Sequence, residues 1–193
     1  MIRAFEQLPE EYHLIQEVDL QKNKKLALWL NLAALMVGVI MALTAHLFVP
    51  ISSLFDFSQG MMMYFFRYLV LILSMVAYII LHEAVHGIVM KAFGARKVRY
   101  GFTGLYAFAG TDAYFDKVSY ITIALAPVVV WGVVLLVLNL LVPASWFWVV
   151  WFTQIINISG AAGDAYVTVK FAKLPADILV HDHGTGMKVY SKM

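Results

Sequence analysis

The stretch MMMYFFRYLVLILSMVAYIILHEAVHGIVM, residues 61–90, is an apolar run that ends in a cluster of ionisable side chains. A helix needs about 20 apolar residues to cross the hydrocarbon core of a bilayer, and this run is longer than that. His82, Glu83 and His86 lie in its last third. Ionisable groups inside a span are costly and are usually functional. The stretch therefore predicts both a membrane span and a chemical site.

The composition places the whole chain in the membrane class. Of its 193 residues, 62% are hydrophobic and only 13% are charged, which is too apolar for an ordinary soluble domain. The chain has no cysteine, so disulfides and thiolate metal sites are excluded. Any bound metal must therefore be held by histidine and carboxylate side chains.

Four apolar runs predict an all-α membrane protein with four transmembrane helices. The spans are expected at about 27–49, 61–90, 119–142 and 146–169 within a membrane domain of residues 27–169. Residues 1–26 form a predicted cytoplasmic N-terminal segment, and residues 170–193 form a predicted cytoplasmic tail. Lysine and arginine gather before the first span, between the second and third, and after the fourth, so both termini are expected in the cytoplasm. Arg67, on the outer half, is expected to reach the interface.

The cytoplasmic loop 91–118 shows a period of two. Its aromatic residues take even positions, namely Tyr100, Phe102, Tyr106, Phe108 and Tyr114. This pattern predicts a short β-hairpin with one aromatic face and a turn at Thr103–Gly104. One interpretation is that a free strand edge pairs with an extended substrate peptide, with Tyr100, Phe102, Tyr106 and Phe108 on the pairing strands. The alternative is an interfacial aromatic anchor.

The spacing of His82 and His86 is typical of a metal site. Residues four apart lie on one helix face about one turn apart, so both imidazoles can reach one zinc ion. Glu83 is rotated about 100° from His82, off the axis of the two histidines. It is placed to take a proton from a water on the metal, as in the HExxH motif. We therefore predict one zinc per chain.

A catalytic zinc needs a third protein ligand, and Asp164 is the candidate. It lies at a membrane depth similar to that of His86 and follows a run of small residues that allows close helix approach. The alternative is that Asp164 anchors a helix end near water. Asn157 is a candidate oxyanion or substrate contact, with interhelical hydrogen bonding as the alternative. The His181-Asp182-His183 run is expected to bind metal only loosely.

HEAVHG and the later NISGAAGD resemble the zincin peptidase family of small bacterial membrane proteins, and the resemblance extends over most of the chain. More remotely the chain resembles the site-2 intramembrane metalloproteases. These resemblances imply His82, His86 and Asp164 as zinc ligands and Glu83 as general base. The Gly163-Asp164-Ala165 setting departs from the aspartate motif of the remote family.

The predicted function is that of a membrane-embedded zinc metalloprotease, which hydrolyses peptide bonds by a zinc-activated water with Glu83 as general base. The alternatives are a non-catalytic zinc-binding membrane scaffold or sensor and a zinc hydrolase of a non-peptide amide. The expected location is the bacterial cytoplasmic membrane, with the zinc site near the cytoplasmic face. The expected partners are membrane lipid and a peptide or membrane-protein substrate, and no nucleic acid.

Overall fold

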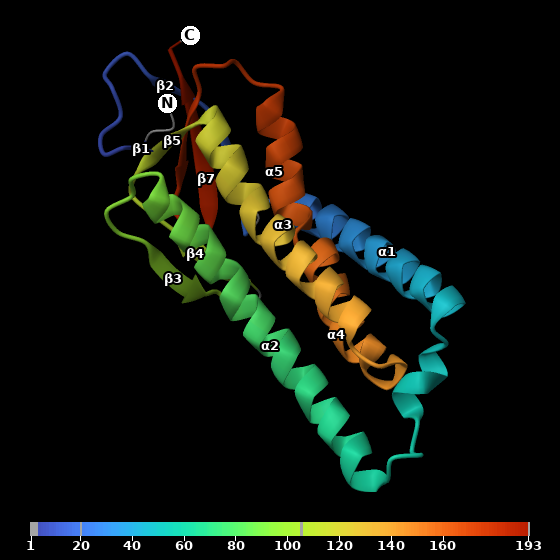
Figure 1. Cartoon of the computed structure of the whole chain (residues 1–193). Helices are drawn as coiled ribbons and strands as arrows, with labels where there is room; N and C mark the ends of the chain where they lie inside the picture. The colour runs from blue at the N-terminus through green and yellow to red at the C-terminus, as the bar shows by residue number, and fades with distance from the viewer. Residues whose placement is uncertain (1–3, 20, 105, 193) are drawn as a thin grey trace. The chain divides into compact units, whose positions relative to one another are not determined.

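The computed structural model describes residues 4–19, 21–104 and 106–192, and every predicted site residue lies within these ranges. The chain is mainly helical, and its strands lie before the first helix, in the 91–118 loop and after the last helix (Figure 1). The helices are α1 (Lys24–Phe48), η1 (Ile51–Phe55), α2 (Met61–Ala92), α3 (Lys117–Leu141), α4 (Ala144–Gly160) and α5 (Ala162–Ala172). The strands are β1 (Ala4–Phe5), β2 (His13–Asp19), β3 (Arg99–Phe102), β4 (Ala107–Gly110), β5 (Tyr114–Asp116), β6 (Leu179–Asp182) and β7 (Gly186–Ser191).

Three helices in the described part of the chain, α1, α2 and α3, are long and apolar enough to cross a membrane. Large apolar side chains are exposed along them, such as Leu35 and Leu43 on α1 and Ile72 on α2. Apolar surface of this extent is typical of contact with lipid tails. The structure is therefore consistent with a membrane protein.

The fourth predicted span, 146–169, is divided into two helices. Helix α4 ends at Gly160, Ala161 has φ −80° and ψ 17°, and α5 begins at Ala162. Gly160 and Gly163 lie on either side of the break, and glycine has the lowest helix propensity after proline. Asp164 consequently lies in the first turn of α5. A carboxylate is favoured there by the positive end of the helix dipole.

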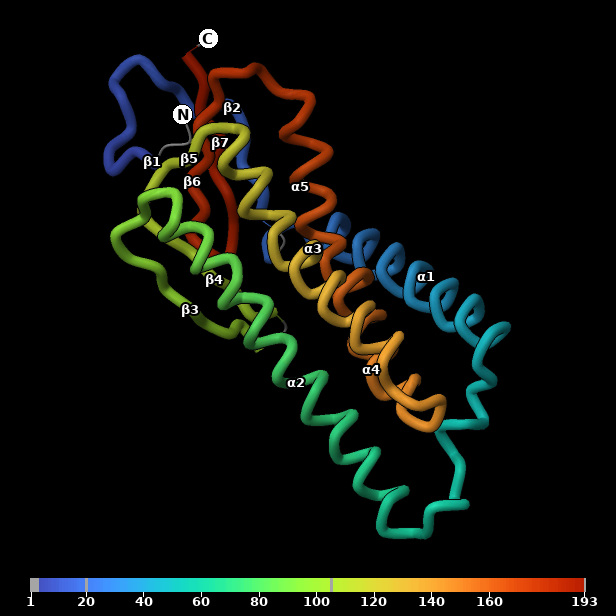
Figure 2. The backbone as a smooth tube through the Cα atoms, in the orientation of Figure 1, coloured from blue at the N-terminus to red at the C-terminus, as the bar shows by residue number. Residues whose placement is uncertain are grey.

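A five-stranded antiparallel sheet makes the all-α prediction wrong. Its strand order is β1-β5-β6-β7-β2, so the segment before α1 and the tail after α5 belong to one sheet (Figure 2). Strands β2 and β7 pair with Leu14 opposite Tyr190 and Val18 opposite Met187. Residues 1–26 and 170–193, predicted as separate segments, are thus joined, and no local pattern predicts pairings between residues so far apart in the chain.

The chain forms two compact units, and the first contains residues 1–30, 82–127 and 163–193. Its core lies between the sheet and the ends of the helices that belong to this unit. Phe115, Phe171, Ile178, Val180 and Val189 are fully buried in it. This unit holds the sheet, the β3–β4 hairpin and every histidine and carboxylate of the predicted zinc site.

The second unit contains residues 31–81 and 128–162. Trp148 is buried in its core and donates its indole N–H to the carbonyl oxygen of Val49 at 3.1 Å. Arg67, expected at the interface, is instead fully buried, which is a correction. Its guanidinium donates to the carbonyl oxygens of Ser53, Asp56 and Ser145. Loops and helix ends expose such carbonyls, and they need donors when they are buried.

The predicted β-hairpin in the 91–118 loop is confirmed, because β3 and β4 form a two-stranded antiparallel sheet. The single aromatic face is wrong. Tyr100 pairs with Ala109 and Gly101 pairs with Phe108, so even positions on β3 lie opposite odd positions on β4. Cross-strand partners point to the same face, and Phe108 therefore faces away from Tyr100. The length of the connection between the strands decides whether even positions on β3 lie opposite even or odd positions on β4. The periodicity of the sequence alone does not give this register.

Candidate metal centre

The HEAVH sequence lies on the C-terminal third of α2, where His82 and His86 project from consecutive turns. Their ring centroids are 4.9 Å apart, as the spacing of four residues predicts. Both side chains are largely shielded, with 12% and 11% of their surface exposed. The two imidazoles are therefore brought together by one helix before any other element contributes.

Asp164 of α5 faces both histidines. His82 Nε2 lies 3.4 Å from Asp164 Oδ2, and His86 Nε2 lies 3.6 Å from Asp164 Oδ1. One atom from each residue can be chosen so that all three lie within 4.8 Å of one another. Two donors bound to one tetrahedral zinc at about 2.0–2.2 Å stand about 3.4 Å apart. The two histidine–aspartate separations are close to this value, so the three side chains could hold a divalent ion.

The hydrogen bond of His86 identifies its metal-facing nitrogen. His86 Nδ1 lies 2.9 Å from the carbonyl oxygen of Ile123 on α3. A carbonyl only accepts, so Nδ1 carries a proton, and Nε2, which faces Asp164, is the nitrogen that remains to bind a metal. Metal-binding histidines commonly have such a partner on the other ring nitrogen. No lysine or arginine in the described chain forms an ion pair with Asp164. A metal cation bound at this site would therefore balance the negative charge of its carboxylate.

Glu83 lies outside the donor set, on the adjacent flank of α2. The backbone N–H of Ala109 on β4 lies close to the carboxylate of Glu83. The hairpin therefore holds this carboxylate beside the two histidines. This arrangement fits a residue that handles a proton next to a metal rather than one that binds the metal.

The part of the chain that carries these residues has known relatives. Residues 75–179 match the family described as "Putative zincin peptidase". The chain belongs to this family. The matched range contains His82, Glu83, His86 and Asp164, and the family's description implies zinc as the metal. The match does not extend to the site-2 metalloproteases, so that remoter resemblance stays a prediction.

One curated relative of this zincin-family chain is an archaeal protein of Pyrococcus woesei named "Uncharacterized 24.7 kDa protein in gap 5'region". The two are 33% identical over 124 residues, which covers 61% of this chain and 53% of the relative. The chain therefore spans about half the length of this relative. No solved structure matches the chain.

Asn157 takes part in a hydrogen-bond network inside the second unit. It is fully buried, and its Nδ2 donates to the carbonyl oxygen of Val128 and to Gln154 Oε1. Its Oδ1 accepts a hydrogen bond from the Tyr78 hydroxyl at 2.9 Å. These contacts correspond to the interhelical role that was the alternative for Asn157.

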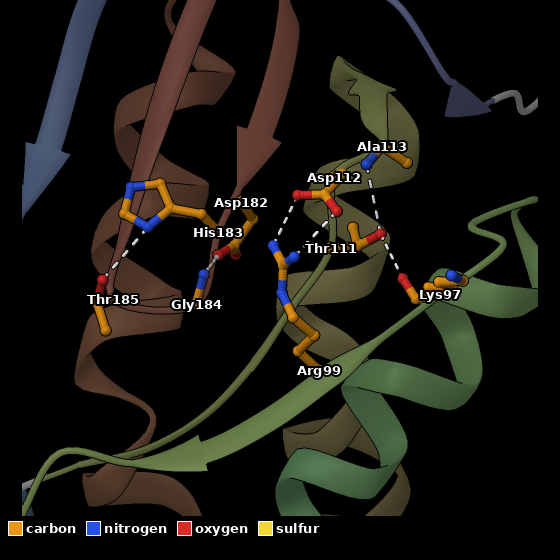
Figure 3. A network of polar contacts seen from close by, with 9 residues as sticks. All are labelled: Lys97, Arg99, Thr111, Asp112, Ala113, Asp182, His183, Gly184 and Thr185. Carbon is orange, nitrogen blue, oxygen red and sulfur yellow. Dashed lines mark hydrogen bonds and ion pairs between the residues drawn. The ribbon is translucent and has the colours of Figure 1, made fainter.

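The His181-Asp182-His183 run divides its side chains among separate contacts. The His181 ring packs on Tyr114 with centroids 4.9 Å apart. His183 Nδ1 lies 3.2 Å from the Thr185 hydroxyl, as Figure 3 shows. Burial among apolar neighbours lowers the pKa of His181. Among the described residues, neither histidine belongs to a metal-holding group of three.

Asp182, the middle residue of this run, is a buried carboxylate with partners inside the protein. Its Oδ2 accepts a hydrogen bond from the Tyr120 hydroxyl at 2.8 Å, and its Oδ1 accepts one from the Gly184 N–H at 2.9 Å. Burial raises the pKa of Asp182 above the ordinary range, although both hydrogen bonds favour the ionised form. No local pattern in the sequence predicts this pairing, because Tyr120 and Asp182 are far apart in the chain.

The hairpin packs on both of its faces. One face lies against α2, where the Tyr100 side chain covers Gly87, and a Cβ on Gly87 would overlap the Tyr100 hydroxyl. On the other face Phe108 covers Gly184, which has φ +97° in the turn between β6 and β7. The guanidinium of Arg99 forms two hydrogen bonds to the Asp112 carboxylate just beyond the hairpin (Figure 3). The hairpin is thus held between the metal-centre helix and the tail.

Proposed function

We propose that the protein is a membrane-embedded zinc metalloprotease that hydrolyses peptide bonds of membrane or membrane-proximal substrates. One observation carries the proposal: the convergence of His82 and His86 on Asp164, with Glu83 on the adjacent flank of the same helix. A site that served structure alone would have no use for a base beside its ligands. The membership in a zincin family supports the same conclusion.

In this proposal His82, His86 and Asp164 hold one zinc ion. Three protein ligands are typical of catalytic zinc sites, which keep one position open. A zinc ion held this way supplies Lewis acidity and lowers the pKa of water from 15.7 to about 7. Glu83 accepts a proton from water and delivers it to the leaving amine. The Ala109 N–H lies close to the Glu83 carboxylate and is placed to orient it for both transfers.

We further propose that an extended substrate segment pairs with the outer edge of β4. The Thr103 N–H donates to the Tyr106 carbonyl, so hydrogen-bonded and non-hydrogen-bonded pairs alternate from that point along the hairpin. Ala107 and Ala109 then belong to non-hydrogen-bonded pairs and direct their backbone N–H and C=O groups away from β3. The Ala109 N–H meets Glu83 in that direction. A segment bonded to Ala107 would therefore run toward the general base.

Ala107→Pro should raise KM for a cleaved peptide about tenfold with little change in kcat. Proline removes the outward N–H and blocks the edge, and one hydrogen bond contributes about 0.5–1.5 kcal/mol. The ladder to β3 does not use this N–H, so the hairpin should persist. Steady-state kinetics with circular dichroism as a fold check would measure the change. Ala107→Ser, which keeps the N–H, is the matched control, and an unchanged KM in the proline variant would remove β4 as the docking edge.

We propose that α4 and α5 together make the fourth membrane pass. The pairing of β2 with β7 supports an even number of crossings, because the chain segments before α1 and after α5 share one sheet. The 17 residues of α4 extend about 25 Å, close to the thickness of about 30 Å of a bilayer core. The distribution of lysine and arginine supports a cytoplasmic location for this sheet.

The proposed function predicts that cleavage depends on bound zinc. The purified chain in lipid nanodiscs would be incubated with a proteome-derived peptide library, and new peptide termini would be read by mass spectrometry. Treatment with 1,10-phenanthroline should abolish cleavage, and added zinc should restore it. The non-chelating isomer 1,7-phenanthroline is the control. A chain that binds one zinc but produces no new termini would instead support the non-catalytic scaffold.

A further inference from the structure

The contact between Tyr100 and Gly87 brings a hydroxyl group close to the proposed general base. The Tyr100 ring lies on α2 so closely that no side chain fits at Gly87. Gly87 follows Glu83 by four residues, so the two positions are neighbours on one flank of the helix, with Cβ positions about 5–6 Å apart. The Tyr100 hydroxyl therefore lies within one helical turn of Glu83.

The pairing of the hairpin gives the same placement independently. Tyr100 on β3 is directly opposite Ala109 on β4, and the Ala109 N–H lies close to the Glu83 carboxylate. Opposite residues in a non-hydrogen-bonded pair have Cα atoms about 4.5 Å apart. The contact with Gly87 on α2 and the pairing with Ala109 on β4 thus both place Tyr100 on the same side of the candidate metal centre, next to Glu83.

The Tyr100 hydroxyl is available to a ligand. The side chain is 53% exposed, and its hydroxyl forms no hydrogen bond with the residues that the structure describes. At this exposure the hydroxyl can donate to water, or to a ligand that takes the place of that water. The Asn157 amide, by contrast, already donates to two acceptors.

We propose that Tyr100 is a catalytic residue whose hydroxyl donates a hydrogen bond to the carbonyl oxygen of the scissile peptide. That oxygen gains negative charge as water adds to the carbonyl carbon, and a fixed donor stabilises the charge. The proton stays on the tyrosine throughout. This role rests on the proposed protease function and replaces the one predicted for Asn157. It also explains the glycine at position 87, since any larger residue would push the hydroxyl away.

Tyr100→Phe should lower kcat about 10²-fold, with KM and zinc content near the wild-type values, because only the hydroxyl is lost. Gly87→Ala should lower kcat to a similar extent, although alanine favours the helix by about 1 kcal/mol over glycine. The variant with both substitutions should have a kcat no lower than that of the less active single variant, because both changes act through one hydroxyl. Tyr114→Phe, which makes the same change on β5, is the matched control. A Tyr100→Phe kcat close to wild type would overturn the proposal.

A second measurement needs no turnover. The cobalt-substituted protein would be titrated with acetohydroxamate, whose oxygens imitate the charged carbonyl oxygen, and binding would be followed in the visible spectrum. Tyr100→Phe should weaken this binding about tenfold relative to wild type and Tyr114→Phe, as expected for one lost hydrogen bond to a charged group. Equal affinity in all three proteins would overturn the role of Tyr100. Wild type without any peptide cleavage would instead count against the proposed function, and the titration would still decide for or against Tyr100 as a donor.

Discussion

Glu83→Gln should leave one zinc per chain and lower peptide turnover about 10³-fold. The glutamate lies outside the three side chains that converge, so its neutralisation should not release the metal. Glutamine has nearly the shape of glutamate, and the hairpin has its own β3–β4 pairing, so the hairpin should stay in place. What is lost is the proton acceptor, and general acid–base catalysis contributes about 10²- to 10⁴-fold to rates.

The measurement combines zinc analysis by mass spectrometry with kinetics on a peptide found in the library experiment. Glu17→Gln is the matched control, because Glu17 lies on β2 and pairs with exposed Lys22. That variant should retain both zinc and turnover. If Glu83→Gln loses its zinc, Glu83 must be counted among the ligands. If its turnover stays within a few-fold of wild type, the base is another residue.

Asp164→Ala should weaken zinc binding by at least about 10²-fold and abolish turnover with it. Asp164 is the only carboxylate among the three converging residues of the described chain, and both histidines face it. Changes in residues that only support metal ligands already cost about 10- to 100-fold in affinity, so loss of a ligand should cost more. Two histidines alone do not complete a tetrahedral zinc site.

Competition with a chelating indicator dye would give the zinc affinity of each protein. Asp112→Ala is the control, since Asp112 is an exposed carboxylate that pairs with Arg99 and has no part in the converging group. The hydrogen bonds from Arg99 keep the pKa of Asp112 below its ordinary value, so the control also removes a true negative charge. Undiminished zinc affinity in Asp164→Ala would show that the third ligand lies elsewhere.

The sequence was sufficient for the parts of the molecule that depend on neighbours along the chain. The apolar run of α2 and the four-residue spacing of His82 and His86 are local properties of a helix, and the structure has both. The period of two in the 91–118 loop likewise predicted the hairpin. Asp164 was found by a chemical argument, namely the need for a third ligand of the right kind at a similar depth.

The features that were missed depend on partners far away in the sequence. The sheet joins Leu14 to Tyr190, and strand propensity does not say which distant strand will pair. The burial of Asp182 cannot be predicted without knowing that Tyr120, far away in the sequence, donates a hydrogen bond to it. The hydroxyl of Tyr100 gains its significance only through the register that sets Tyr100 opposite Ala109.

The sheet also has a consequence for the order of biosynthesis. Strands β6 and β7 lie between β5 and β2 in the sheet, yet they follow every helix in the sequence. When α2 leaves the ribosome with His82, Glu83 and His86, the turn that packs against the hairpin at Gly110 has not yet been translated. The sheet that belongs to the same unit as these three residues is therefore still incomplete at that stage. The five-stranded sheet is complete only after the two strands that follow α5 have been made and have paired between β5 and β2.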